Sequence, residues 1–212
     1  MRPPLGFIIT KTNGWTLLIK ESLAAHAERL ISAEGNPLGV NIARSECRVV
    51  VLEKEGKFFR KILHHGGALA PILRGVYLSK KRLFRLLESA EMLSKADIPT
   101  PPVVAIGWRP IIPFAWRLVV LTEWQEKAQP LSLALRKMDH QQRRKAILDS
   151  ASLVRSTFKA GVELKDLHPD NILIDEDGKL CLTDIEDVRL HASAVPLERQ
   201  KKVILRLMRA LL

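Results

Sequence analysis

Hydrophobic positions in the first half of the chain form short runs separated by turn signals, a pattern typical of β-strands. The runs at residues 7–9 and 15–19 are separated by Asn13-Gly14, which favours a tight hairpin. Four further runs predict strands, with residues 109–115 as the loop between the last two: residues 48–52, 57–63, 105–108 and 117–122. Residues 21–31 and 80–95 instead repeat their apolar positions at helical spacing. The first half is therefore predicted to be rich in β-structure, with two helices.

The second half of the chain has the hydrophobic spacing of helices, interrupted by one hairpin. Helices are predicted at residues 131–137, 141–160 and 197–212, with Asp139 as the N-cap of the second and Gly161 at its end. Residues 164–187 between them read LKDLHPDNILIDEDGKLCLTDIED. Two apolar runs flank an Asp-Gly turn there, which predicts short antiparallel strands. The last helix is expected to dock through an apolar stripe made of Leu197, Val203, Ile204, Leu207, Leu211 and Leu212.

Three polar residues of this hairpin region suggest a site. Asp166 and Asn171 precede the first strand, and Asp184 follows the second. Because the strands are antiparallel, their outer ends meet, so we expect the three side chains to converge at one end of the hairpin. Carboxylate and amide oxygens are ligands that Mg²⁺ prefers, especially when it is carried by a nucleotide.

The same residues resemble the catalytic and metal loops of the protein-kinase-like superfamily, whose pattern is H-R-D-L-x-x-x-N followed by D-F-G. Leu164-Lys165-Asp166 stands for H-R-D, and Asp184-Ile185-Glu186 stands for D-F-G. The resemblance implies ATP and Mg²⁺ as cofactors. It also implies that Asp166 accepts the proton of the substrate hydroxyl, and that Asn171 and Asp184 hold the metal. His168, where protein kinases often carry lysine, is more similar to kinases of sugars and other small molecules.

A strand lysine and a helix glutamate complete the expected phosphate site of such a fold. The resemblance implies that Lys61 steadies the nucleotide phosphates, and strand alternation sends Arg60 to the opposite face. Glu88 and Glu91 are the candidates for the acid that pairs with this lysine. Helix phase does not separate them cleanly, and Glu88 is favoured.

The expected adenine site follows the last strand of the first half. Glu123 and Trp124 stand at the hinge of a kinase-like fold, whose backbone groups would bind adenine. The usual glycine-rich phosphate loop is missing, since residues 39–45 contain no G-x-G-x-x-G. Any phosphate cradle there would use Arg44, Ser45 or backbone N–H groups.

A narrower resemblance covers the chain from about residue 41 to the C-terminus. The basic strand, a His-His-Gly-Gly loop, a helix and the segment Asp-Ile-Pro-Thr-Pro-Pro are similar to the lipopolysaccharide-core kinase family, which includes kinases of Kdo and heptose. The fold implied is α+β and two-lobed: a β-rich N-lobe at residues 1–122, a hinge and linker at 123–130, and a reduced helical C-lobe at 131–212. The activity implied is ATP-dependent phosphorylation of a sugar hydroxyl in the lipopolysaccharide inner core.

Charge supports an anionic partner. The chain has 34 Lys and Arg against 23 Asp and Glu, a formal net charge of +11. Such an excess suits an anionic sugar or glycolipid, an anionic membrane surface, or nucleic acid. Specific nucleic-acid binding is not expected, because aromatic residues make up only 5% of the chain and form no stacking cluster. The basic last helix could dock with a solvated back or contact an anionic membrane.

The remaining sequence features concern compartment. Cys47 and Cys181 lie in apolar strand-like runs without metal or disulfide spacing, which favours buried thiols in a reducing cytoplasm. The N-terminus lacks the pattern of a signal peptide, and no apolar stretch approaches the ~18 residues of a membrane span. We therefore expect a cytoplasmic enzyme that contacts the inner face of the bacterial inner membrane peripherally.

Two alternatives to a sugar kinase stay open. One is a non-catalytic, kinase-like binding module, which the missing glycine loop and Asp-Ile-Glu in place of D-F-G favour. The other is a small atypical protein kinase. Lys165 in place of the usual arginine, and the lack of an A-P-E motif after Asp184, argue against a regulated protein kinase.

Overall fold

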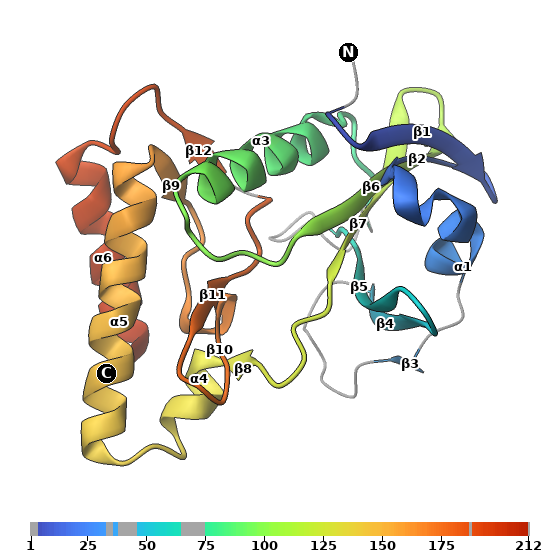
Figure 1. The fold of residues 1–212 in the computed structure, drawn as a ribbon. Coiled ribbons are helices and arrows are strands. Elements are labelled where there is room, and N and C mark those ends of the chain that lie inside the picture. Colours follow the sequence, from blue (N-terminus) through green and yellow to red (C-terminus); the bar gives the residue numbers. More distant parts are fainter. Residues whose placement is uncertain (1–3, 33–35, 38–45, 65–74, 187, 212) are drawn as a thin grey trace. The chain divides into compact units, whose positions relative to one another are not determined.

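The computed structural model describes residues 4–32, 36–37, 46–64, 75–186 and 188–211 (Figure 1). Contacts divide the chain into two compact units. The first consists of Met1–Leu83 and Pro102–Trp124, and the second of Phe84–Pro101 and Gln125–Leu212. An antiparallel sheet dominates the first unit and helices dominate the second, so the α+β class expected from the sequence is confirmed.

The first unit is built on a seven-stranded sheet. Its strands are β1 (Phe7–Thr12), β2 (Trp15–Lys20), β3 (Asn36–Pro37), β4 (Glu46–Leu52), β5 (Gly56–Ile62), β6 (Val103–Ile112) and β7 (Ala115–Glu123). They lie in the order β1-β2-β6-β7-β5-β4-β3, and each neighbouring pair is antiparallel. The predicted hairpin at Asn13-Gly14 is confirmed. Both residues have positive φ, 48° and 76°, as a turn matched to the strand twist requires.

The loop predicted at residues 109–115 is wrong, because β6 and β7 continue through it. Ile112 pairs with Ala115, so the turn is only Pro113-Phe114, and Phe114 has a φ of 65°. Pro110 lies inside this extended part of β6, although proline lacks the N–H that a central strand needs. It is tolerated because β2 pairs with β6 only as far as Trp108, which leaves β6 a single neighbour beyond that residue.

One face of the sheet is covered by a short helical segment (Figure 1). This segment is η1 (Glu21–His26), a 3₁₀ helix, followed by α1 (Ala27–Ile31). The predicted single helix at residues 21–31 is therefore half 3₁₀, but its apolar face is as expected. Leu23, Ala27, Leu30 and Ile31 pack in one cluster with buried strand residues. Each large side chain buried in this way contributes about 1.5–3 kcal/mol to folding before entropy is counted.

The side chain of Arg60 on β5 is buried on this covered face. Its guanidinium donates hydrogen bonds to the carbonyl oxygens of Ile31 (2.9 Å) and Ser32, at the C-terminal end of α1. A cation there satisfies carbonyls that have no partner within the helix and complements the helix dipole. Burial lowers the pKa of Arg60, while the Glu46 carboxylate 3.8 Å away opposes that shift. Arg60 is thus a structural residue.

The predicted helix after the sheet is α3 (Lys81–Lys95). The Ser79 hydroxyl accepts a hydrogen bond from the Lys81 N–H (3.2 Å) at its start. Leu86 and Leu93 are buried in the second unit. The proline-rich segment that follows contacts the same unit, because the Leu182 N–H donates to the Pro99 carbonyl (2.9 Å).

The second unit combines helices with very short strands. Besides most of α3, its helices are α4 (Leu131–Leu135), α5 (His140–Lys159) and α6 (Leu197–Leu211), with a 3₁₀ turn η2 (Pro169–Asn171). Its strands are β8 (Gln129–Pro130), β9 (Val162–Leu164), β10 (Ile172–Ile174), β11 (Leu180–Leu182) and β12 (Val188–Leu190). β10 pairs with β11 and β8, and β9 pairs with β12. The predicted hairpin of β10 and β11 is confirmed.

Helix α5 begins and ends where the sequence predicts. The Asp139 carboxylate accepts a hydrogen bond from the Gln142 N–H (2.8 Å), and the Gln142 side chain accepts one from the Asp139 N–H (3.2 Å). This reciprocal capping box satisfies N–H groups that the helix leaves unpaired. Gly161 follows the helix with a φ of 76°. The chain then enters β9 and the candidate site.

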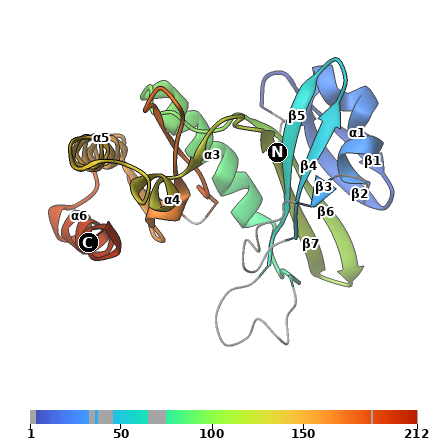
Figure 2. The ribbon, with the colours of Figure 1, turned by 90° about the horizontal axis from the view of Figure 1, so that it is seen from below.

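Helix α6 lies beside α5 (Figure 2), but its buried stripe is narrower than the sequence suggests. Val203 and Leu207 are buried, whereas Leu197 and Ile204 are 71% and 41% exposed. Residues four apart lie on one helix face, whereas neighbours such as 203 and 204 are rotated apart, so this contact buries only one row. The side chains of Leu211 and Leu212 lie outside the described residues. Within the described part of the chain, no helix combines the length and hydrophobicity that crossing a membrane requires.

Candidate functional site

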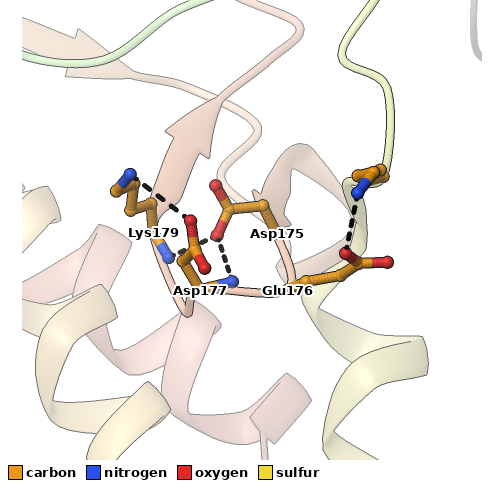
Figure 3. A network of polar contacts seen from close by, with 5 residues as sticks. Asp175, Glu176, Asp177 and Lys179 are labelled. Atoms are coloured by element: carbon orange, nitrogen blue, oxygen red, sulfur yellow. Dashed lines mark hydrogen bonds and ion pairs between the residues drawn. The ribbon is translucent and has the colours of Figure 1, made fainter.

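The candidate site in the second unit is built on the hairpin of β10 and β11. The Asp175 carboxylate closes its turn by accepting hydrogen bonds from the N–H groups of Asp177 (3.0 Å) and Lys179 (2.8 Å) (Figure 3). Ion pairs join Lys179 to Asp177 (3.5 Å) and Glu176 to Lys127 (3.3 Å) around it. These short-range contacts fix the turn, so the opposite end of the hairpin has a defined geometry.

That opposite end carries the predicted catalytic base, Asp166, and the predicted metal ligands, Asn171 and Asp184. Asp166, Asn171 and Asp184 line one small pocket in the second unit, together with Leu164, Lys165, Leu167 and Thr183. The Asn171 side-chain amide donates a hydrogen bond to the Asp166 carbonyl (2.9 Å). The backbone carbonyl of Asn171 accepts a hydrogen bond from the Thr183 N–H (2.9 Å), which links the loop to the end of β11. The three side chains are thus brought together by the loop's own hydrogen bonds.

The donor set of this pocket fits Mg²⁺. The Asn171 NH₂ group donates to the Asp166 carbonyl, so the amide oxygen of Asn171 is the atom that would meet a metal ion, and the Asp184 carboxylate lines the same pocket. Mg²⁺ is usually held by one or two protein oxygens, with water and substrate phosphates supplying the rest. Among the described residues, no group of three or more His, Cys, Asp or Glu side chains is placed to hold a metal ion.

Asp184 has an unusual backbone conformation. Its φ of 60° lies in the left-handed region, which costs a non-glycine residue about 1–2 kcal/mol. Aspartate tolerates this region better than most residues, and such strain is often found at functional sites. Glu186, at the glycine position of the D-F-G pattern, is buried with 4% of its surface exposed.

Arg206 is a residue of this site that the sequence did not identify. Its guanidinium, which comes from α6, donates to the Lys165 carbonyl and lies 3.7 Å from an Asp166 carboxylate oxygen. The Arg206 side chain is half exposed, and that of Asp166 is 84% exposed. A cation at the predicted catalytic base can hold an anionic substrate there. The amphipathic pattern of the helix placed Arg206 only among its basic residues.

A buried carboxylate holds α6 against the strand that leads into the loop. Glu163 on β9 hydrogen-bonds to the His191 ring (2.8 Å) and accepts from the Arg199 guanidinium (3.4 Å) on α6. Burial alone would raise the pKa of Glu163, but these hydrogen bonds and the charges of Arg199 and Arg189 lower it overall. One ion-pair network therefore joins β9, β12 and α6. Its central residue, Glu163, precedes Lys165 by two residues in the chain.

The predicted phosphate-binding lysine lies in the first unit. Lys61 is half-buried on β5, and strand alternation places it on the face opposite Phe58 and Arg60, which contact the η1–α1 side. Phe59 shares the face of Lys61, and its ring centroid lies 6.1 Å from that of Trp124. The lysine face of the sheet thus also carries an aromatic pair suited to stacking on a base.

The two hinge residues, Glu123 and Trp124, differ in the groups that they could present to adenine. Glu123 pairs with Phe58 in the strand register, so its carboxylate lies on the other face, where it contacts the Lys20 ammonium (3.3 Å). The Glu123 N–H donates to the Pro102 carbonyl and the Trp124 N–H to the Lys57 carbonyl, both at 2.9 Å. These two N–H groups are already used, so a contact of this pair with adenine would fall to their carbonyl oxygens and to the Trp124 ring.

A second pocket, of about 460 Å³, adjoins the hinge within the first unit. Lys20, Lys57, Phe58, Glu123 and Trp124 are among the residues that line it. Because Phe58 and Glu123 face the η1–α1 side, most of this pocket lies away from the lysine face.

The glutamate expected to pair with Lys61 belongs to the second unit. Glu88 on α3 is exposed, and its carboxylate has no hydrogen-bond or ion-pair partner among the described residues. Glu91 instead pairs with Lys95 at 2.6 Å, which leaves Glu88 the better candidate. Its pairing with Lys61 stays a prediction. The phosphate-cradle candidates Arg44 and Ser45, and the His-His-Gly-Gly loop beyond His64, lie outside the described residues.

Both cysteines lie in strands, and neither forms a disulfide. Cys47 and Cys181 are half-buried rather than fully buried. Burial, with the Asp175 carboxylate nearby, raises the pKa of Cys181 to about 12. Its thiol is therefore protonated at neutral pH and is no nucleophile.

An antiparallel sheet unit followed by a helical unit with an Asp–Asn–Asp loop defines the protein-kinase-like class. Within this class, the chain belongs to the lipopolysaccharide kinase (Kdo/WaaP) family, whose sequence profile matches residues 32–211. The family is one of phosphotransferases, which implies the use of ATP. This confirms the family resemblance drawn from the sequence.

A solved structure supports the fold. The chain is similar to one described as "WaaP in complex with acyl carrier protein", with a TM-score of 0.64 and 15% sequence identity. The match covers 92% of this chain and 80% of that chain, which confirms the kinase-like fold. A search of curated proteins found no significant match.

Proposed function

We propose that this protein transfers the γ-phosphoryl group of ATP to a hydroxyl of an anionic sugar in the lipopolysaccharide inner core, of the Kdo or heptose type. The observation that carries the proposal is the pocket that gathers Asp166, Asn171 and Asp184 on the β10–β11 hairpin. Family membership supplies the substrate class. The net charge of +11 and Arg206 beside the pocket support an anionic acceptor.

In this reaction Asp166 orients the acceptor hydroxyl and accepts its proton. The hydroxyl oxygen forms a bond to the γ-phosphorus, the bond to the β–γ bridging oxygen breaks, and ADP leaves. Asn171 and Asp184 would hold Mg²⁺, which neutralises charge on the phosphates when bound. Lys61 would steady the phosphates, with Glu88 as its partner, and the ring of Trp124 would contact adenine. Catalysis of this kind consists mainly of positioning and charge stabilisation.

The decisive experiment measures Mg²⁺-dependent transfer from γ-labelled ATP to delipidated core oligosaccharide. Wild type is compared with Asp166→Asn, which keeps the size of the side chain but removes the base. We expect a fall of about 100-fold or more, the lower range for loss of a general base. Asp177→Asn is the matched control, since it makes the same chemical change at the exposed far end of the hairpin.

Other outcomes separate the alternatives. Binding of Mg-ATP without transfer would point to another acceptor, such as a protein. Neither binding nor transfer by the folded wild type would contradict the proposal and favour a non-catalytic binding module. Equal activities of wild type and Asp166→Asn would remove Asp166 from the mechanism.

A further inference from the structure

The hairpin of β6 and β7 ends in an apolar tip that packs against nothing in the described structure. Five consecutive residues, Pro110 to Phe114, are exposed and have no polar side chain. Ile111, Ile112 and Phe114 are 42%, 61% and 82% exposed. We call Ile111, Ile112, Pro113 and Phe114 the apolar tip. A contiguous exposed run of this kind is costly in water and usually marks a binding surface.

Cations and indoles surround the base of this tip. Arg109 and Arg117 stand opposite each other in the strand register, directly below Pro110 and Trp116. The Lys80 ammonium lies 4.8 Å from the Trp108 ring centroid and 5.0 Å from that of Trp116. We call Lys80, Trp108, Arg109, Trp116 and Arg117 the basic-aromatic collar. All of these residues belong to the first unit.

The collar has no acidic residue of its own strands to balance it. Residues 103–122, which cover nearly all of the hairpin, contain neither Asp nor Glu. Arg109 also contacts the Trp15 ring, 5.1 Å from its centroid, but like charges directly opposite each other disfavour a strand pair, so a nearby anion would stabilise Arg109 and Arg117. The chain as a whole carries a net charge of +11. The surface is therefore complementary to an extended anionic partner.

The order of these groups along the hairpin matches the layers of a lipid bilayer. From the turn towards the rest of the sheet, the hairpin carries the apolar side chains of the tip first and then the indoles and cations of the collar. Tryptophan is enriched at the membrane–water interface, and Lys and Arg bind anionic headgroups. The two strands stay paired with each other as far as Ile112 and Ala115, with one register shift between Pro110 and Ile112, so the tip is a short turn rather than a long loop. Such a turn suits shallow insertion at the headgroups, where water can still reach the outer backbone groups of the two strands.

We propose that the apolar tip and basic-aromatic collar bind an anionic lipid bilayer, with the tip inserted among the acyl chains near the headgroups and the collar at the phosphates. This surface would anchor the protein peripherally, which suits an enzyme with a glycolipid substrate. The inference deepens the proposed function by naming the membrane-contact surface, but its test needs neither ATP nor a sugar.

The test is flotation with vesicles of phosphatidylcholine alone or with about one-third phosphatidylglycerol. The tip variant is Ile112→Thr with Phe114→Asn. Threonine keeps the β-branching of a strand residue, and asparagine tolerates the positive φ of residue 114. Both side chains are exposed, so the fold should be retained, which circular dichroism checks.

The matched control removes two exposed apolar side chains from α6, the other surface for which the sequence left membrane contact open. Ile204→Thr with Leu205→Asn changes α6, where these residues are 41% and 56% exposed. We expect wild type to bind anionic vesicles, the tip variant to bind about tenfold or more weakly, and the α6 variant to stay within about twofold. Salt should weaken binding by wild type, since 1 M ions shorten the Debye length to about 3 Å.

An independent readout comes from the indoles of the collar. Tryptophan emission should shift to the blue when wild type meets anionic vesicles, and brominated lipids should quench it. Three results would overturn the proposal: wild type that floats with neither vesicle, a tip variant that floats as well as wild type, or loss of flotation only in the α6 variant. Concentration-dependent dimers that the tip mutations abolish, without vesicle binding, would assign the tip to a second copy of the chain.

Discussion

Replacing Arg206 with alanine tests whether this residue merely accompanies Asp166 or binds the acceptor. Its guanidinium lies 3.7 Å from the Asp166 carboxylate, and both side chains are at least half exposed. At that distance, in a medium close to water, the attraction between the two charges is about 1 kcal/mol. Measured surface pairs contribute about 0–1 kcal/mol. Loss of the ion pair alone should therefore change activity by less than about fivefold.

An acceptor anion held by Arg206 predicts a larger effect. One N–H of the guanidinium is donated to the Lys165 carbonyl, and the planar fork has further donors for a carboxylate or phosphate. Hydrogen bonds to a charged group contribute about 1.5–3 kcal/mol. Arg206→Ala should then lower kcat/KM for the anionic acceptor by about 10- to 100-fold. Arg206→Lys should recover only part of this, because lysine keeps the charge without the fork.

The assay compares core oligosaccharide with the same oligosaccharide after reduction of its carboxylates to alcohols. Arg206→Ala should discriminate between the two acceptors less than wild type does, while KM for ATP stays unchanged. Arg209→Ala is the control, since Arg209 is an exposed arginine one helical turn further along α6. If Arg206→Ala and Arg209→Ala gave the same kinetics on both acceptors, the acceptor role of Arg206 would be refuted. The proposed kinase activity would survive that result.

Two further predictions concern the segment that leads into the site. Gly161→Ala should lower the free energy of unfolding in urea by about 2–5 kcal/mol, because a Cβ at its φ of 76° would lie 2.7 Å and 2.8 Å from the His191 and Ser193 carbonyl oxygens. Gly178→Ala is the control: residue 178 has a φ of 79° but open space around it, so the loss should be only about 1–2 kcal/mol. Equal losses in the two variants would contradict the predicted clash. Glu163 has a pKa below its ordinary value of 4.5, so its stabilisation is complete above about pH 4.5 and is lost as the pH falls through the folded value. Glu163→Gln should therefore lower stability at pH 7 by about 2 kcal/mol and flatten the acid limb of the stability curve, whereas an unchanged limb would mean that Glu163 does not carry it.

The features that the sequence predicted best are those determined by neighbouring residues. The Asn13-Gly14 turn needs two residues with positive φ, and the cap of α5 needs Asp139 three residues before Gln142. Asp166 and Asn171 are likewise joined within one loop by a hydrogen bond over five residues. Such signals survive in a single sequence because no distant segment is needed to interpret them.

The features that the sequence missed depend on segments far apart in the chain. Arg206 reaches Lys165 across 41 residues, and Glu163 reaches Arg199 across 36. Periodicity identified α6 as amphipathic, but how much of its apolar stripe is buried depends on how the helix packs in the second unit. In the structure Val203 and Leu207 form the buried row. The loop predicted at residues 109–115 is a different failure. Proline is disfavoured in central strands, but β6 tolerates Pro110 because it has only one neighbouring strand there.

The Glu163 network gives these long-range contacts a shared function. Glu163 lies on β9, three residues before Asp166, and its partners His191 and Arg199 follow Asp184 in the chain. One buried carboxylate thus fastens the segment before the predicted base to the helix that carries Arg206. Removing a charge partner from a buried network leaves the others uncompensated, so loosening it should displace α6 as well as weaken the fold. Glu163→Gln should therefore reduce discrimination between charged and reduced acceptors, as Arg206→Ala does, although Glu163 does not line the pocket. A Glu163→Gln enzyme that retained full discrimination would show that α6 holds Arg206 in place without this network.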